Sequence, residues 1–150
     1  MKNPHARVHY AVCRPDLDTP VGRAEGLLCI AKEFLNVGKL ASADTSTFAR
    51  YFLLYHAIET ALKAHLARSG MTDRELQGLG HDITGAAAEA EKRGFTLHAN
   101  ERTVLDGFEC SVGKRDFEPS VAMRYLYFGS PSCPTFDNLT YVTEAIVSRV

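Results

Sequence analysis

The sequence TFARYFLLYHAIETALKAHLARS, residues Thr47–Ser69, decides the fold of this chain. Its large apolar side chains recur at spacings of three and four residues, which is the period of an α-helix. Gly70 follows at once, as glycine commonly does after the last residue of a helix. Leucines and alanines fill the side opposite the stripe of large apolar residues. The stretch therefore predicts a long helix buried on two sides, with small residues that permit close approach of another helix, inside a bundle or across a dimer.

Further helices are expected on both sides of this one. A stretch from Val21 to Gly38 repeats the three-and-four spacing, with Ile30 among its inward-facing residues and Gly38 as its expected end. Good N-capping residues predict the starts of four more helices, and these are Thr72, Asp82, Asn100 and Thr135. The expected helices cover residues 21–38, 47–69, 73–77, 83–93, 101–112 and 136 onwards.

Alternation of apolar and polar residues, the signature of a strand, is limited to a weak run at Val8–Val12. We therefore expect an all-α fold, an up-and-down bundle of four to five helices. Residues 1–20 contain three prolines and no helical period, which predicts an irregular N-terminal arm. Residues 21–150 are expected to form a single helical domain, with a long connection before its last helix.

The composition excludes several classes of function. The chain has 150 residues, of which 45% are hydrophobic, and a formal net charge of -1, as in an ordinary globular domain. Because the charge is near zero, no overall field attracts nucleic acid, and DNA is not expected as a partner. Neither a signal segment nor a run long enough to cross a bilayer is present, which predicts a cytoplasmic protein without membrane attachment. Scattered cysteines and the lack of a phosphate loop predict neither a metal nor a cofactor.

Glu59 is the polar residue of greatest interest, because it falls within the apolar stripe of the long helix. A buried carboxylate is costly unless it is paired or hydrogen-bonded. His56 and Lys63 lie beside it on the helix, and the turn at His81-Asp82 is a second source of partners. Two interpretations stay open. In the first, Glu59 holds this turn to the bundle by accepting hydrogen bonds from the backbone N–H groups of the turn or from His81. In the second, Glu59 forms a polar site with His56, Lys63 and His81.

Arg124 is the remaining candidate for a polar binding cluster. It directly precedes a group of aromatic residues, Tyr125, Tyr127 and Phe128. Aromatic side chains interleaved with cations are what a reader of RNA requires. Only Arg124 supplies such a cation here, so these aromatics are more typical of a core or an interface.

Two motifs together give this chain a family resemblance. The run Tyr55–Leu66, YHAIETALKAHL, is followed by the turn Gly80-His81-Asp82-Ile83. The pair resembles a branch of the HEPN (higher eukaryotes and prokaryotes nucleotide-binding) superfamily. The late Arg124-Tyr125 and the proline-rich approach to a last amphipathic helix are also similar to that branch. The resemblance covers about residues 20–150 and implies a bundle of four to five helices that is often dimeric.

The resemblance also implies two kinds of function. Many HEPN proteins are metal-independent ribonucleases that carry Arg, four to six residues, and then His. Arg50 and His56 match that spacing, although Tyr51 stands where active members usually have a polar residue. Other members are inactive and serve as binding or assembly modules. Arg50 and His56 lie about 120° apart on a helical wheel, so we expect them to converge only at a bent helix start or across a dimer.

These observations lead to two main hypotheses. The first is a non-catalytic HEPN-like module that forms a homodimer and binds a partner protein or a small anionic ligand. The second is an endoribonuclease of a defence or toxin–antitoxin system, with Arg50 and His56 as its catalytic residues and RNA or a nucleotide as its ligand. Family analogy alone suggests a third, in which a nucleotidyltransferase partner modifies a tyrosine such as Tyr51.

Overall fold

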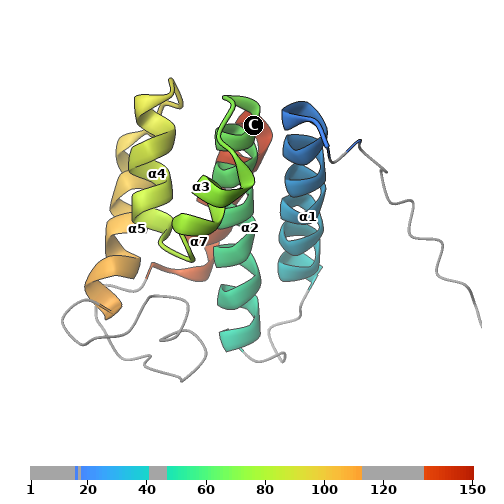
Figure 1. Ribbon diagram of the computed structural model, residues 1–150. Coiled ribbons are helices and arrows are strands. Elements are labelled where there is room, and N and C mark those ends of the chain that lie inside the picture. Colours follow the sequence, from blue (N-terminus) through green and yellow to red (C-terminus); the bar gives the residue numbers. More distant parts are fainter. Residues whose placement is uncertain (1–15, 17, 41–46, 113–133) are drawn as a thin grey trace, which may run out of the picture.

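The computed structural model describes residues 16, 18–40, 47–112 and 134–150. Within them the chain forms helices and no strands, as expected, and the helices pack into a bundle (Figure 1). Their bounds are α1 Pro20–Leu40, α2 Thr47–Arg68, α3 Asp73–Gly78, α4 Ile83–Lys92, α5 Ala99–Val112 and α7 Phe136–Arg149. No helix in the described part of the chain is long and apolar enough to cross a membrane.

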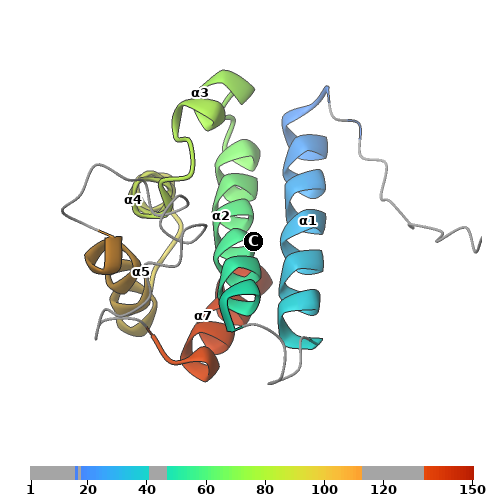
Figure 2. The same cartoon turned by 90° about the horizontal axis from the view of Figure 1, so that it is seen from below.

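The helix α2 lies at the centre of the bundle. It packs against α1 on one side and α4 on the other, while α7 crosses a third side (Figure 2). Leu54, Ile58 and Leu62 are fully buried, and burial of each such side chain contributes about 1.5–3 kcal/mol. The prediction that this helix is buried on two sides is therefore confirmed.

Small residues bring α1 and α2 close together. Ala24 and Ala31 on α1 and Ala57 and Ala61 on α2 are completely buried. Gly38 was expected to end the first helix, but it lies inside α1, which continues to Leu40. A Cβ atom at this position would lie 3.1 Å from Leu54 Cδ2. The glycine is thus a point of close helix contact and not a terminator.

The expected topology needs two corrections. The described residues contain six helices and not the four to five expected for the bundle, because the short helix predicted at residues 73–77 forms as the separate element α3. When the short helix α3 is left out, strict up-and-down alternation also fails. The helices α1 and α2 are antiparallel, but α3 leads the chain back along α2, so that α4 runs in the same direction as α2 (Figure 1).

Three of the four predicted N-capping residues are confirmed. Thr72 forms a full capping box with Glu75, Asp82 accepts from Gly85 N–H at 2.8 Å, and Thr135 caps α7. Each satisfies a backbone donor that the first turn of a helix leaves unpaired.

Asn100 is not a cap, contrary to the prediction. The helix α5 begins at Ala99, two residues before its predicted start, and its first turn is capped by Glu101, whose Oε2 accepts from His98 N–H at 2.8 Å. Glu101 supplies the third-position half of a capping box, so the side chain of Asn100 is not required there. It instead bonds Asn138 of α7, at 2.8 Å.

Candidate functional site

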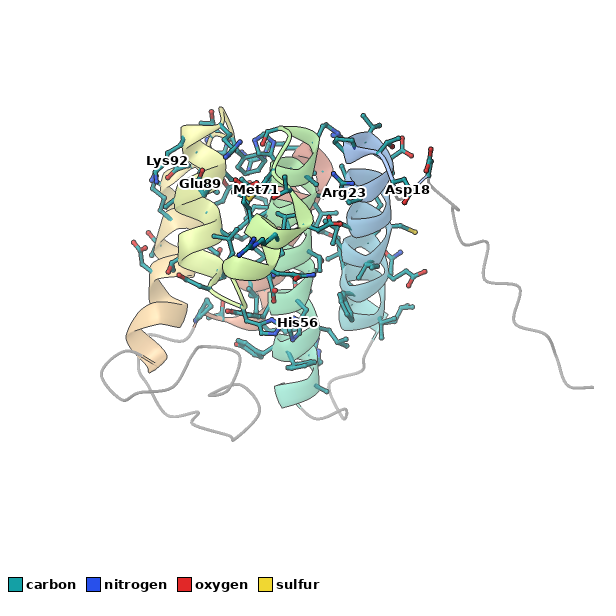
Figure 3. The ribbon with its side chains drawn as sticks, viewed as in Figure 1. Asp18, Arg23, His56, Met71, Glu89 and Lys92 are labelled. Carbon is teal, nitrogen blue, oxygen red and sulfur yellow. The ribbon has the colours of Figure 1, made fainter. Side chains whose placement is uncertain are left out.

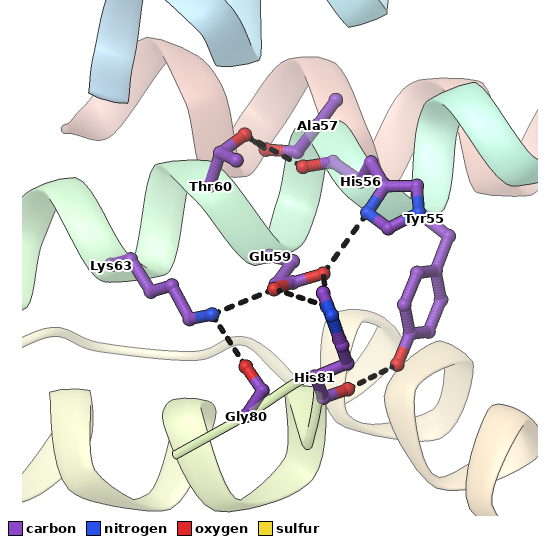
Figure 4. Close-up of polar contacts among 8 residues, drawn as sticks. All are labelled: Tyr55, His56, Ala57, Glu59, Thr60, Lys63, Gly80 and His81. Carbon is purple, nitrogen blue, oxygen red and sulfur yellow. Dashed lines mark hydrogen bonds and ion pairs between the residues drawn. The ribbon is translucent and has the colours of Figure 1, made fainter. Parts of the chain in front are cut away.

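A polar cluster centred on Glu59 lies where α2 meets the turn between α3 and α4 (Figure 4). The Glu59 residue is only 3% exposed, so its carboxylate cannot be solvated by bulk water. Three side chains from two segments meet it instead. His56 and Lys63 come from the adjacent turns of α2, and His81 comes from the turn that precedes α4.

Lys63 links the carboxylate to the turn. Its Nζ donates to Glu59 Oε1 at 2.7 Å and to the backbone carbonyl of Gly80 at 2.5 Å. The spacing of four residues along a helix places the glutamate and the lysine on one face. The lysine therefore neutralises the buried charge and at the same time fastens the turn to α2.

Both histidines direct Nδ1 at the carboxylate. His56 Nδ1 lies 3.0 Å from Glu59 Oε2, and His81 Nδ1 lies 3.1 Å from Oε1 and 3.3 Å from Oε2. Because an ionised carboxylate can only accept hydrogen bonds, each Nδ1 carries a hydrogen and donates it. In a neutral imidazole the other nitrogen, Nε2, is then left as the acceptor.

The surroundings of the two histidines differ. His56 is largely buried, and its ring makes an edge contact with Phe52 at 4.3 Å between centroids and also contacts Phe34 of α1. The side chain of His81 is 44% exposed. Its backbone carbonyl accepts from the Tyr55 hydroxyl at 2.8 Å, which fixes the turn at a second point. The cluster is therefore closed on the side of His56 and open to solvent on the side of His81.

The cluster keeps Glu59 ionised. Burial by itself raises the pKa of this carboxyl, but the hydrogen bonds from His56 and Lys63 and the charges of Lys63 and His81 outweigh it. Together they lower the pKa of Glu59 from 4.5 to about 2. A fixed negative charge thus sits beneath two imidazoles, an arrangement that can orient a base, hold a cation or stabilise the turn.

The expected interaction of Glu59 with the backbone of the turn takes another form. The Gly80 N–H donates to Gln77 O, and the Asp82 N–H donates to Leu79 O, so both groups are already used within the turn. The carboxylate reaches the turn through Lys63 and His81 instead. Asp82, also a predicted member of the cluster, points elsewhere, because its side chain caps α4.

Arg50 and His56 have separate surroundings. The Arg50 guanidinium carbon lies 3.3 Å from the centroid of the Phe136 ring, at the start of α7. His56 is bound to Glu59 on the side that faces α3 and α4. Within the described residues no contact joins Arg50 to His56, and the two have different partners. Arg124, with the aromatic residues after it, lies outside the described residues.

Tyr51, the candidate for modification, is 8% exposed, and its hydroxyl donates to the backbone carbonyl of Pro134 at 2.6 Å. Modification would require that this contact be broken.

Two participants were not foreseen from the sequence. The hydroxyl of Tyr55 and the carbonyl of Gly80 complete the cluster. Tyr55 lies in the apolar stripe, where a tyrosine is interpreted as a core residue. The hydroxyl of a buried tyrosine, however, usually has a hydrogen-bond partner. That rule was the one available signal. A backbone carbonyl leaves no signal in a sequence.

The cluster also has the composition of a metal site. One possible ligand atom from each of His56, Glu59 and His81 lies within 4.8 Å of the other two.

Comparison with family models, characterised proteins and solved structures finds no match to this chain. The resemblance of Tyr55–Leu66 and of the Gly80–Ile83 turn to the HEPN superfamily accordingly stays a prediction.

Proposed function

We propose that this chain is a HEPN-like helical module of the cytoplasm that forms a homodimer and acts by binding and not by catalysis. The observation that carries the proposal is an apolar stripe on the outward side of α1. Ile30, Val37 and Leu40 are 43%, 53% and 82% exposed, respectively. Ile30 was expected to face inward, but the inward positions are taken by Ala24 and Ala31, which are completely buried.

The spacing of the stripe is typical of helix pairing. Its apolar residues lie at 30, 37 and 40, spaced by seven and by three residues, as in a repeat of seven residues over two helical turns. This is the 3.5-residue period by which two helices contact each other along a seam. The helix α1 lies at the edge of the bundle, where it packs against α2 and, less extensively, against α7 (Figures 1 and 2).

A second copy of the chain is the partner that we propose for this stripe. A net charge of -1 produces little repulsion between copies. In a symmetric dimer the same stripe on each copy meets its equivalent, so one apolar surface is sufficient for both partners. Dimerisation is also what the family resemblance implies.

Sedimentation equilibrium in a reducing buffer tests the assembly. We expect a dimer for the wild type and a monomer for the Ile30→Asp/Val37→Asp double variant, with unchanged helical circular dichroism. Ala88→Asp is the matched control, because Ala88 is an exposed residue of α4, and it should remain dimeric. A wild type that is monomeric at high concentration would refute the proposal, as would a double variant that is folded and still dimeric.

The alternative, a metal-independent endoribonuclease, has one observation in its favour. Arg50 has no ion-pair partner among the described residues, and its buried Nε has no hydrogen-bond partner there. A guanidinium in this state can bind a phosphate of RNA or of a nucleotide. Catalysis would also require His56 within hydrogen-bond reach of the same phosphate, yet His56 is bound to Glu59.

An RNA-cleavage assay in EDTA separates the two proposals. We expect no cleavage by the wild type and unchanged dimers for Arg50→Ala and His56→Ala. Cleavage by the wild type that both variants lose, while remaining folded, would establish the ribonuclease and overturn the non-catalytic proposal.

A further inference from the structure

We propose that His56, Glu59 and His81 form a binding site for one divalent transition-metal ion of the Zn²⁺ class. The inference is independent of the dimer, because none of the three residues belongs to α1. It rests on the convergence of two imidazoles and one carboxylate, donors that suit zinc, cobalt and nickel better than magnesium or calcium. No sequence spacing predicted it, since His81 follows Glu59 by 22 residues.

The distances between the donor atoms suit such an ion. Zinc binds imidazole nitrogen and carboxylate oxygen at about 2.0–2.2 Å in a tetrahedron, which places neighbouring donors about 3.3 Å apart. Glu59 Oε2 lies 3.0 Å from His56 Nδ1 and 3.3 Å from His81 Nδ1. An ion among these three atoms would replace two N–H···O hydrogen bonds by metal–ligand bonds. Each neutral imidazole would move its hydrogen from Nδ1 to Nε2, so no proton need leave the site.

The remaining groups of the cluster support single-oxygen coordination. Lys63 donates to Glu59 Oε1, whereas Oε2 is the oxygen that lies within 3.3 Å of Nδ1 of both histidines. A ligand carboxylate whose second oxygen is held by a hydrogen bond is the usual outer-shell arrangement of metal sites. Burial of Glu59 keeps competing water away from the anionic ligand, and the half-exposed His81 leaves one side open. Three protein ligands with an open fourth position are the pattern of a site that also binds water or a small ligand.

Titration of the metal-free 150-residue chain with Co²⁺ is the direct test, because tetrahedral Co²⁺ has visible absorption bands. We expect one equivalent to bind to the wild type. The key variant is His81→Ala, because the half-exposed residue can be replaced without opening the core, and we expect at least about a tenfold loss of affinity. His98→Ala is the matched control, since His98 is an exposed histidine away from the cluster, and it should bind as the wild type does.

The N-terminal His5 and His9 provide a second control. The His5→Ala/His9→Ala variant should retain the Co²⁺ bands, and Zn²⁺ should raise the Tm of this variant but not that of His81→Ala. The proposal is overturned if the wild type shows no bands, if His81→Ala binds as tightly as the wild type, or if binding disappears with His5 and His9.

Discussion

Replacement of Glu59 by glutamine should destabilise the protein far more than the same change at an exposed glutamate. Glutamine preserves the shape of the side chain but removes the charge that binds Lys63 and the two histidines. Lys63 would then be a largely buried ammonium without a counter-ion, since its other partner is the neutral carbonyl of Gly80. An uncompensated buried charge is among the most costly defects in a folded protein.

The size of the effect can be worked from the carboxylate itself. A pKa of about 2 in the folded state against 4.5 for an ordinary glutamate corresponds to about 3 kcal/mol of stabilisation at neutral pH. Hydrogen bonds to charged groups contribute about 1.5–3 kcal/mol each, which gives the same order of magnitude. We therefore expect Glu59→Gln to lower the free energy of unfolding by about 3 kcal/mol at pH 7.

Glu89→Gln is the matched control. Glu89 also accepts from two cations, Lys92 at the end of α4 and Arg93 directly after it. Their side chains are solvent-accessible, and Glu89 and Lys92 lie on the outer side of α4 (Figure 3). Exposed ion pairs contribute little because water and salt screen them. Urea unfolding in EDTA, followed by circular dichroism, should therefore give a much lower midpoint for Glu59→Gln and an almost unchanged midpoint for Glu89→Gln.

Acid provides a second test of the same reasoning. Because the folded-state pKa of Glu59 lies below the unfolded value, its stabilisation is complete above pH 4.5 and is lost as the pH falls towards 2. The difference in stability between the wild type and Glu59→Gln should accordingly shrink as the pH is lowered from 5 to 2. Equal midpoint shifts for the two glutamine variants at pH 7, or a difference that is constant with pH, would refute the reasoning.

Three further changes have defined outcomes in thermal or urea unfolding. Gly70→Ala should destabilise the protein by about 1 kcal/mol because φ at Gly70 is +93°, although no atom obstructs the new methyl group. Gly78→Ala is the control, because Gly78 is equally open but has no positive φ, and it should not destabilise the protein. Equal destabilisation by the two changes would contradict the explanation. Thr135→Ala should cost about 1 kcal/mol through loss of the cap of α7, whereas Thr135→Ser should restore it. Tyr55→Phe should cost about 1–2 kcal/mol, because the His81 carbonyl loses its donor; an unchanged midpoint would show that water replaces the hydroxyl.

Much of the fold could be predicted because it depends on neighbours in the sequence. The period of residues 47–69 gave α2, and Thr72, Asp82 and Thr135 act on backbone groups only a few residues away. The ends of α1 and α5 were less predictable. Gly38 lies inside α1, at a position where a Cβ atom would crowd Leu54, and Glu101 takes the capping role predicted for Asn100.

The candidate site likewise combines features that depend on neighbours in the sequence with features that depend on distant segments. The sequence by itself determined that Glu59 must be buried and paired, and that His56 and Lys63 lie within reach, because helical geometry places residues three and four apart on one face. Only the tertiary structure decided that His81 and the Gly80 carbonyl complete the cluster, that Arg50 packs on Phe136, and that Ile30 faces outward. Such contacts depend on how α3 folds back along α2 and on which side of α1 is covered, and both are settled by packing between distant segments rather than by local periodicity.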